Sequence, residues 1–516
     1  MAEKVITIQA PLLGWGKGDF TQSNSAAIEA KEGAYSQSNS ASLFRIGKLG
    51  HIAPGETFTA LTASGVTVDG LPLNGVVASN REAFVYLDTA HVVKFGLSDF
   101  LIDGERQVSL VSTAAHGAHS SLSGADCDVF NYKNATNEYI LYSWNDATDG
   151  DVGRMLKDAS SPDDDWLSTL VTQTNGTALT AGVPHKIGFG PDNCIYITNG
   201  QYIAYHAPNS TAIDYKKLDL GFGWIATDLD VDGSFLVVSA YKSTLDTNSY
   251  SAGESTIFYW DTIKPSYNYP VDLQDNYVSA IQKNNGKVYA FTYGRNNTAK
   301  VKLIQGSTFQ TLFESVQIGV APRAGATDIF QNMIHYGTGG SIHTVDADAF
   351  HFRTSATTDG STLPSDIGMV KNLSQNILFV GRKVSSTYSI VKIDYTGYHI
   401  NADFRTRLYS TPYKANIEKI IVYFSQFGTG ASVKFSLFKD YKDMSPGSAD
   451  DQLNLTVTNS TYPGISSINL ATVSGWKTIT DVNNFYMNFR FNHASASNTA
   501  AIIQRVEIYL STTGKA

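Results

Sequence analysis

Alternating carboxylates stand in the segment DLDVDGSF, in which Asp228, Asp230 and Asp232 precede a glycine. A calcium loop begins in the same way, because a hard cation needs several oxygen ligands within a short arc and glycine lets the chain turn sharply. Here, however, the ninth position of such a loop is Leu236 and the twelfth is Ser239 instead of glutamate. A strand-like run follows at once, so a solvated turn explains the same residues. The sequence favours the turn, and a calcium site stays open as the alternative.

Two other segments contain residue types that are common in catalysis. His116 and His119 lie in AAHGAHSSLSG, and Asp163, Asp164 and Asp165 form the acidic run of SSPDDDWLS. The chain lacks both the G-x-S-x-G elbow of a nucleophilic serine and the H-E-x-x-H helix of a zinc site. Polar surface loops explain both segments. We therefore predict no catalytic residue, no metal ligand and no cofactor site.

The cysteines and the remaining histidines form no ligand pattern either. Cys127 and Cys194 are too far apart in the sequence for a C-x-x-C motif and too few for a disulfide framework. Two buried, inert thiols are the expected outcome. His335 and His343 fall in one predicted hairpin and could face each other across it, an arrangement that is more often structural than functional.

The composition predicts a protein of strands and turns. The chain has 28 Tyr, 26 Phe and 43 Gly, while only 16% of its residues are charged. Aromatic side chains suit a pleated surface and glycine suits tight turns. A net charge of -9 without any run of Lys or Arg argues against nucleic-acid binding. We expect no signal peptide and no membrane-spanning helix, since neither a cationic start before an apolar core nor a long apolar stretch occurs.

A unit of two short apolar runs separated by a polar break recurs seven times. One copy is DNCIYITNGQYIAYHA, in which Asn199 and Gly200 predict a two-residue hairpin turn. The seven copies begin at Asn80, Thr136, Asp192, Asp232, Asn285, Gln331 and Ser374. The intervals of 40 to 56 residues match the roughly 40 to 50 residues of a four-stranded propeller blade. The runs are apolar on both faces, as expected for a sheet covered by a neighbour on each side.

These patterns define an all-β chain with three parts. Residues 1–49 are small and polar, with the near-copies TQSNSA and SQSNSA, and predict an extended N-terminal arm that becomes ordered against a neighbour, or a disordered terminus. Residues 50–398 predict a β-propeller of seven blades, with six as the nearest alternative. Residues 399–516 contain the strand-like runs IEKIIVYF, SVKFSLF, FYMNFRF and QRVEIYL, which predict a C-terminal antiparallel, jelly-roll-like β-sandwich.

This organisation, with the segment FRTRLYSTPYKANIEKIIVYF from Phe404 to Phe424, resembles virion structural proteins of tailed bacteriophages, of the tail nozzle, hub or minor-tail type. The resemblance implies a non-enzymatic subunit, made in the host cytoplasm and located in the virion. Such a subunit assembles with copies of itself and other virion proteins into a symmetric ring or fibre. It assigns no catalytic residue.

A carbohydrate-active protein is the competing hypothesis. It would be a propeller glycosidase or a lectin with a sugar-binding C-terminal module, and carboxylates from distant blade loops could meet at the axis. Exposed Tyr or Trp beside Asp or Glu pairs would favour it. A third hypothesis, binding of a host receptor or surface glycan at a virion tip, overlaps both.

Overall fold

The computed structural model describes most of the chain. The described residues are 3–9, 17–18, 34–39, 41–42, 53–54, 57–63, 67–107, 127–134, 136–158, 166–167, 170–243, 253–294, 298–314, 321–330, 333–346, 352–356, 364–374, 377–394, 398–399, 401–406, 408–439, 453–493 and 500–512. Within these ranges the protein is all-β, and the helical elements with described bounds are the short 3-10 turns η3 (Ala324–Ala326) and η4 (Leu470–Thr472). None of these turns is long or apolar enough to cross a membrane. The chain forms two compact units.

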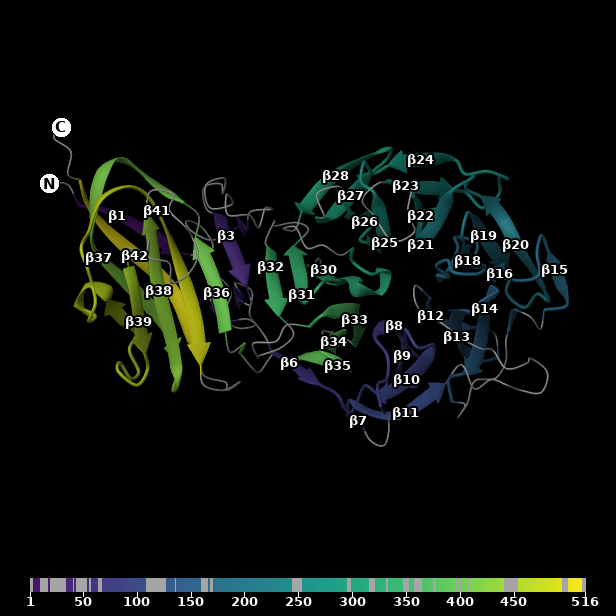
Figure 1. Ribbon diagram of the computed structural model, residues 1–516, viewed down its shortest axis with the longest axis horizontal. Coiled ribbons are helices and arrows are strands. Elements are labelled where there is room, and N and C mark those ends of the chain that lie inside the picture. The colour runs from purple at the N-terminus through teal and green to yellow at the C-terminus, as the bar shows by residue number, and fades with distance from the viewer. Residues whose placement is uncertain are drawn as a thin grey trace. The chain divides into compact units, whose positions relative to one another are not determined.

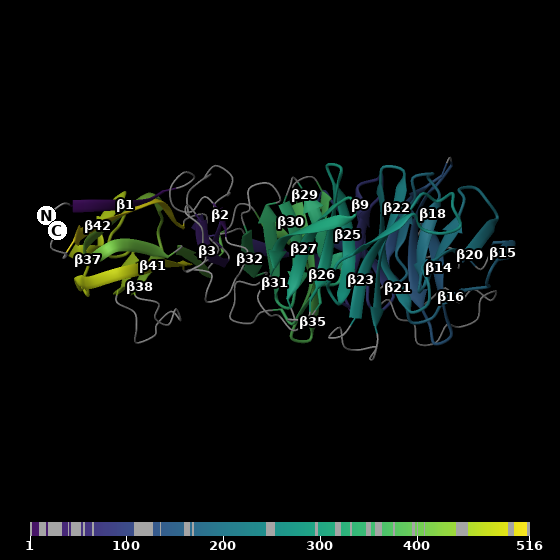
Figure 2. The same ribbon diagram turned by 90° about the horizontal axis from the view of Figure 1, so that it is seen from above.

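One unit comprises residues 59–341 and 362–392 and is a seven-bladed β-propeller. Figure 1 shows its small sheets arranged in a ring, and Figure 2 shows the same strands from the side. The first strand of each sheet lies nearest the axis and contacts the first strands of the neighbouring sheets, with β33 against β8 completing the circle. The predicted propeller and its seven-fold count are therefore confirmed.

Each blade follows the order of the chain from the axis outwards. The first blade consists of β8 (Pro72–Val77), β9 (Glu82–Leu87), β10 (His91–Gly96) and β11 (Leu101–Gln107). The second consists of β12 (Val129–Lys133), β13 (Glu138–Asn145), β14 (Asp149–Leu156) and β16 (Leu179–Thr180). The third consists of β17 (Ile187–Phe189), β18 (Ile195–Asn199), β19 (Tyr202–His206) and β20 (Ala212–Asp219). Short parallel strands, β7 (Thr62–Ala63) and β15 (Thr172–Thr174), add to the outer edges of the first and third blades.

Of the other four blades, the fourth and fifth repeat this order, the sixth has three described strands, and the seventh takes its outermost strand from the start of the propeller. They are β21 (Trp224–Asp232), β22 (Phe235–Ser243), β23 (Gly253–Trp260) and β24 (Tyr269–Asp272); β25 (Tyr277–Asn284), β26 (Lys287–Tyr293), β27 (Ala299–Gln305) and β28 (Thr308–Glu314); β29 (Thr327–Phe330), β30 (Met333–Thr338) and β31 (Ser341–Asp346); and β33 (Asp366–Ser374), β34 (Ile377–Val384), β35 (Thr387–Asp394) and β6 (Thr57–Ala60). The seven hairpins predicted from the sequence are the second and third strands of these blades.

The ring is closed by a strand from the start of the propeller. β6 is the outermost strand of the seventh blade, although the other three strands of that blade come from the end of the propeller. The N–H of Leu61, just after β6, donates to the carbonyl of Ile390 at 2.9 Å. Backbone hydrogen bonds thus fasten the two ends of the ring together, which leaves the last blade with four strands.

The hydrophobic core lies between the blades. Phe84 and Tyr86 of β9 pack with Ile140 and Tyr142 of β13 in a cluster that combines the first and second blades. Further clusters combine the second with the third blade, the third with the fourth, the fourth with the fifth, and the seventh with the first. The middle strands are buried on both faces for this reason, which explains why their sequences are apolar throughout.

The hairpin β18–β19 turns one residue later than predicted. Asn199 pairs with Tyr202, so the loop residues are Gly200 and Gln201. Gly200 has a φ of +63°, as the first loop residue of a type II′ turn requires. Asn199 is buried, and its amide donates to the carbonyl of Tyr215 at 2.9 Å while its oxygen accepts from the N–H of Thr180 at 2.6 Å. Its role is to join strands of two blades.

The second unit comprises residues 1–58, 342–361 and 393–516. Its hydrogen-bonded strand order is β1 (Glu3–Gln9), β42 (Ala501–Thr512), β37 (Tyr409–Phe427), β41 (Ile479–His493), β36 (Asn401–Thr406), β3 (Ala34–Asn39) and β32 (Phe352–Ala356). The remaining strands are β2 (Lys17–Gly18) beside β3, β38 (Ala431–Lys439) between β41 and β39 (Leu453–Thr458), β40 (Ser467–Asn469) beside β37, and the pair β4 (Ala41–Ser42) and β5 (Ala53–Pro54).

These boundaries differ from the predicted ones. Described residues of the predicted arm are strands of the second unit: β1 pairs with β42 from Glu3 to Gln9, and β3 pairs with β36. The division after residue 341 also assigns residues 342–361 to this unit, and these include all of β31 except Ser341. Pairing between distant segments leaves no trace in local composition, so a polar terminus was predicted where the chain contributes strands. The copy TQSNSA lies outside the described residues.

A substitution at Gly325 of η3 tests how closely the blades of the ring are packed. A β-carbon at this position would overlap the backbone carbonyl of Leu73 in the first blade. We expect Gly325→Ala to destabilise the protein by about 3 kcal/mol or more, because backbone cannot move aside as a side chain can. Thermal or urea unfolding measures the effect. Gly233→Asn is the control, since Gly233 has open space around it and asparagine tolerates its φ of +60°. Equal stability of the two variants would contradict this account of the ring.

Candidate functional site

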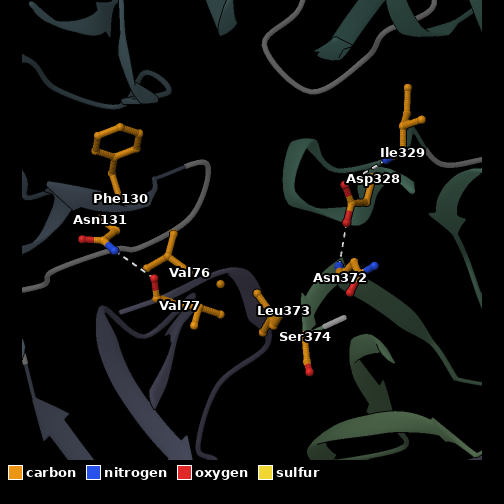
Figure 3. Close-up of a pocket in the computed structure, with 10 residues that line it drawn as sticks. Val76, Val77, Phe130, Asn131, Asp328, Ile329, Asn372, Leu373 and Ser374 are labelled. Carbon is orange, nitrogen blue, oxygen red and sulfur yellow. Dashed lines mark hydrogen bonds between the residues drawn. The ribbon is translucent and has the colours of Figure 1, made fainter. Parts of the chain in front are cut away.

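A pocket of about 620 Å³ lies among four inner strands of the propeller. It is lined by Gly75, Val76 and Val77 of β8, Phe130 and Asn131 of β12, Asp328 and Ile329 of β29, and Asn372, Leu373 and Ser374 of β33. Figure 3 shows Phe130 and Asn131 on one side, Asp328 and Asn372 on the other, and the two valines with Leu373 between them. Only the carboxylate of Asp328 brings an ionisable group into this lining.

The inner strand of a blade is a sheet edge, and its N–H groups that face the axis have no partner within their own blade. Asp328 satisfies two such groups. Its Oδ1 accepts from the N–H of Ile329 at 2.8 Å, and its Oδ2 accepts from the N–H of Asn372 in the next blade at 2.6 Å. The carboxylate is therefore a clamp that joins the sixth blade to the seventh.

Asp228 on β21 makes the same clamp between the fourth and fifth blades. Its Oδ1 accepts from the N–H of Leu229 at 2.9 Å, and its Oδ2 accepts from the N–H of Ile281 at 2.9 Å. The register of β21 against β22 shifts between Ala226 and Asp228, so the strand bulges directly before the clamp. Such a bulge re-aims a side chain, here towards the neighbouring blade.

Asp128, directly before β12, joins the second blade to the third. Its Oδ1 accepts from the N–H of Val129 at 2.9 Å, and its Oδ2 accepts from the N–H of Ile187 at 3.2 Å. The side-chain amide of Asn74, on β8 of the first blade, also donates to Asp128. Three aspartates, called the clamp aspartates below (Asp128, Asp228 and Asp328), thus connect blades in the same way.

The carboxyl group of Asp228 interacts with Lys186 and Asp128 as well as with its two N–H donors. Burial raises its pKa to about 7, although the N–H groups of Ile281 and Leu229 and the nearby Lys186 favour the charged form. Removal from water therefore outweighs its hydrogen bonds. Asp230, two residues on, also has a pKa raised by burial, and its Oδ1 accepts from the N–H of Val231 at 2.7 Å.

Asn131 anchors the opposite wall of the pocket. Its amide donates to the carbonyl of Val77 at 2.8 Å and to Glu138 at 2.9 Å. Burial acts to raise the pKa of Glu138, but hydrogen bonds from Ser79 and Asn131 and the charge of Lys157 outweigh it and lower the pKa to about 2. The first and second blades are held together here by an ionised, hydrogen-bonded carboxylate.

The segment DLDVDGSF is neither a calcium loop nor a solvated turn. Asp228, Asp230 and Asp232 all lie on β21, where the first two bind backbone N–H groups and the third lies 3.7 Å from Lys283. Throughout the described ranges, no three His, Cys, Asp or Glu side chains are placed to hold a metal ion together. The turn begins only after Asp232, because the inner strand continues to this residue.

The other candidate residues are structural or lie outside the described ranges. His116, His119 and the aspartates at 163–165 belong to segments that the structure does not describe. Cys127 and Cys194 are buried and form no disulfide. His335 and His343 are buried on β30 and β31, and burial lowers the pKa of His343 to about 4.

A buried lysine and a buried aspartate in the fifth blade form the other group of side chains that could take part in a reaction. Lys302 lies 2.6 Å from Asp275, and the Nζ of Lys300 lies 3.0 Å from the same carboxylate. Burial lowers the pKa of Lys302, but the hydrogen bonds to Asp275 oppose this. Thr292 also donates to Asp275 at 2.6 Å. With these partners the carboxylate is a structural acceptor, not an accessible base.

Sequence reasoning missed two clamp aspartates and the whole pocket. One signal was present: each clamp aspartate is followed directly by an aliphatic residue (Val129, Leu229, Ile329) in a position upstream of a recurring hairpin. The pocket residues come from four distant segments, and no spacing in the sequence brings them together.

Comparison with known proteins gives matches among solved structures. No family model and no curated protein matches the sequence. Among solved structures, Raptor from Chaetomium thermophilum matches with a TM-score of 0.47 and 11% identity over 66% of this chain and 29% of Raptor. The computationally designed Ika8 protein matches with a TM-score of 0.38 and 14% identity over 64% of this chain and 99% of Ika8. The chain thus spans less than a third of the length of Raptor.

Removing a clamp aspartate should destabilise the contact between two neighbouring blades. Asp228→Ala leaves the N–H groups of Leu229 and Ile281 without acceptors, and we expect a loss of about 2–4 kcal/mol in unfolding free energy, since each orphaned group costs about 1–3 kcal/mol. Asp232→Ala, on the same strand but half-exposed, should change stability by no more than about 0.5 kcal/mol. Urea unfolding of both variants checks this, and a smaller effect for the first variant than for the second would contradict the clamp.

The pKa of Asp228 predicts a pH dependence with a definite sign. Because its folded pKa of about 7 exceeds the ordinary 3.8, the folded state holds a proton that the unfolded state releases. This stabilising contribution is complete below pH 3.8 and is lost as the pH rises through about 7. We expect the stability of wild type relative to Asp228→Asn to fall across this window, by up to about 1.4 kcal/mol per pH unit. Urea unfolding at a series of pH values measures it, and a constant difference would refute the assignment.

Proposed function

We propose that the protein is a non-enzymatic structural component of a tailed-phage virion, a tail protein that assembles into a symmetric ring or fibre. The observation that carries this proposal is the use of the axis carboxylates. The clamp aspartates are hydrogen-bonded to backbone N–H groups of adjacent blades, so they supply rigidity where a propeller enzyme would place its acid and base. A closed ring without long sheet edges is a suitable building block for an assembly.

The second unit supports an assembly role if its strands form the predicted jelly-roll-like β-sandwich. β41 pairs with β37 through its first half and with β36 and β38 through its second half. β37 leaves β41 and continues along β42, with three register shifts on the way. Strands that change partners at bulges form the corners of orthogonal sandwiches. We infer that β37 and β41 pass from one layer to the other.

The burial pattern agrees with a layered arrangement. On β38, Ala431, Val433 and Phe435 are buried while the residues between them are partly exposed. On β42, Val506, Ile508 and Leu510 are buried in the same alternation. Each strand therefore has one apolar face along this part of its length, and two such faces packed against each other would bury both. Described strands from residues 3–9 and 34–39 would then belong to the sandwich, not to an arm that reaches a neighbour.

The virion role predicts that the protein is found in particles. We expect it to co-purify with phage particles in a fixed copy number that is a multiple of the ring symmetry, as measured by quantitative mass spectrometry of gradient-purified particles. The purified protein should release no reducing ends from host polysaccharides, because its clamp aspartates are fixed to backbone N–H groups of neighbouring blades. Absence from particles would contradict the proposal.

Turnover of a polysaccharide would support the glycosidase alternative instead. The decisive variant is Asp328→Asn, since Asp328 is the carboxylate that lines the pocket. Asp232→Asn serves as the matched control away from the pocket. Hydrolysis that Asp328→Asn abolishes and Asp232→Asn leaves intact would establish an enzyme and overturn the structural role.

A further inference from the structure

We propose that the axial pocket binds a short neutral saccharide. The first argument is that the pocket is preformed. Asp328 is fixed by the N–H groups of Ile329 and Asn372, and Asn131 is fixed by the carbonyl of Val77 (Figure 3). Each hydrogen bond between different blades ties one wall to the next. Its volume of about 620 Å³ lies within the range of about 300–1,000 Å³ that is usual for small-molecule sites.

The second argument is the charge of the lining. The ten lining residues include one carboxylate and no Lys, Arg or His. A phosphate, sulfate or acidic sugar would meet Asp328 without any compensating cation, so an anionic ligand is disfavoured. A quaternary ammonium ion would require a cage of aromatic rings, whereas Phe130 is the single aromatic side chain of the lining. These two considerations favour a neutral ligand over an anion or a quaternary ammonium ion.

The third argument is the combination of polar and apolar groups. Asp328 keeps lone pairs on both oxygens beyond the two backbone hydrogen bonds, so it can accept from two adjacent hydroxyl groups of one sugar ring. Ser374 adds a hydroxyl group on the same side, and Asn372 adds the oxygen of an amide whose nitrogen donates to the carbonyls of Ser374 and Ile377. Across the pocket, Phe130 offers a ring to the C–H face of the sugar, whose hydrogens carry a slight positive charge that suits a π system.

The orientation of that ring is fixed by a neighbour. Phe130 packs edge to face against Phe189 of the third blade, with ring centroids 5.1 Å apart and planes at 72°. Phe189 itself is 36% exposed. A ring held in this way loses little conformational entropy on binding. The pocket therefore presents a carboxylate on one wall and an oriented aromatic ring on the other, which together match the two chemical faces of a pyranose.

The test uses the full-length protein and saturation-transfer NMR with galactose, glucose, mannose and N-acetylglucosamine as probes. At least one of these sugars should give a saturable signal with a dissociation constant on the order of 1 mM. Phe130→Leu keeps an apolar side chain but removes the ring, and should weaken binding roughly tenfold. Phe222→Leu is the matched control, because Phe222 is 89% exposed in a loop that does not line the pocket.

Ser374→Tyr, which puts a bulky side chain into the lining of the pocket, is a second variant and keeps the test decisive if Phe130→Leu fails to fold. Retained binding in a folded Ser374→Tyr protein, equal binding by wild type and Phe130→Leu, no binding of any of the four sugars, or stronger binding of sialic acid or tetramethylammonium would each overturn the proposal. The measurement involves no particle, so it can fail while the virion role holds, and the virion role can fail while the sugar binds.

Discussion

The backbone N–H groups at the inner edge of each sheet set the central constraint on this propeller. A blade is a small open sheet, and its first strand turns an unpaired edge towards the axis, where water or another group must satisfy it. In this chain Asp128, Asp228 and Asp328 take over part of that task and reach to the next inner strand at the same time. One side chain thus satisfies an edge and fixes the angle between two blades. The same use of carboxylates leaves the axis with walls that are rigid and mostly neutral.

Much of the propeller could be predicted from the sequence, because its middle strands are buried on both faces. The hairpin from Ile195 to His206 is apolar for that reason, and its six counterparts have the same character and similar spacing. The inner and outer strands are less uniform, since each has one edge without a sheet neighbour. Strand β17, for example, has only three residues. The pairings β1 with β42 and β6 with β35 connect segments far apart in the sequence that no local pattern relates.

The site was harder to predict than the fold. Asp228 was a candidate calcium ligand because it is one of three alternating carboxylates. The alternation instead reflects the two-residue period of an inner strand. Asp328 lies in the unremarkable segment TDIF, and its role depends on a backbone N–H from Asn372 in the next blade. A function of this kind is invisible in the sequence because the partner is a peptide group, which every residue has. Phe130 likewise could not be recognised as a pocket residue from the sequence, because its position beside the axis depends on the strand register.

The closing strand β6 has a consequence for the order of events during synthesis. Leu61 leaves the ribosome long before Ile390, its hydrogen-bond partner. At translation rates of about 5–20 residues per second, the interval between them lasts on the order of tens of seconds. During that time the six earlier blades can form in sequence, but the outermost strand of the seventh has nothing to pair with. This short unpaired strand must not pair with other strands until the ring is complete. Ring closure is therefore the step at which folding competes with misassembly.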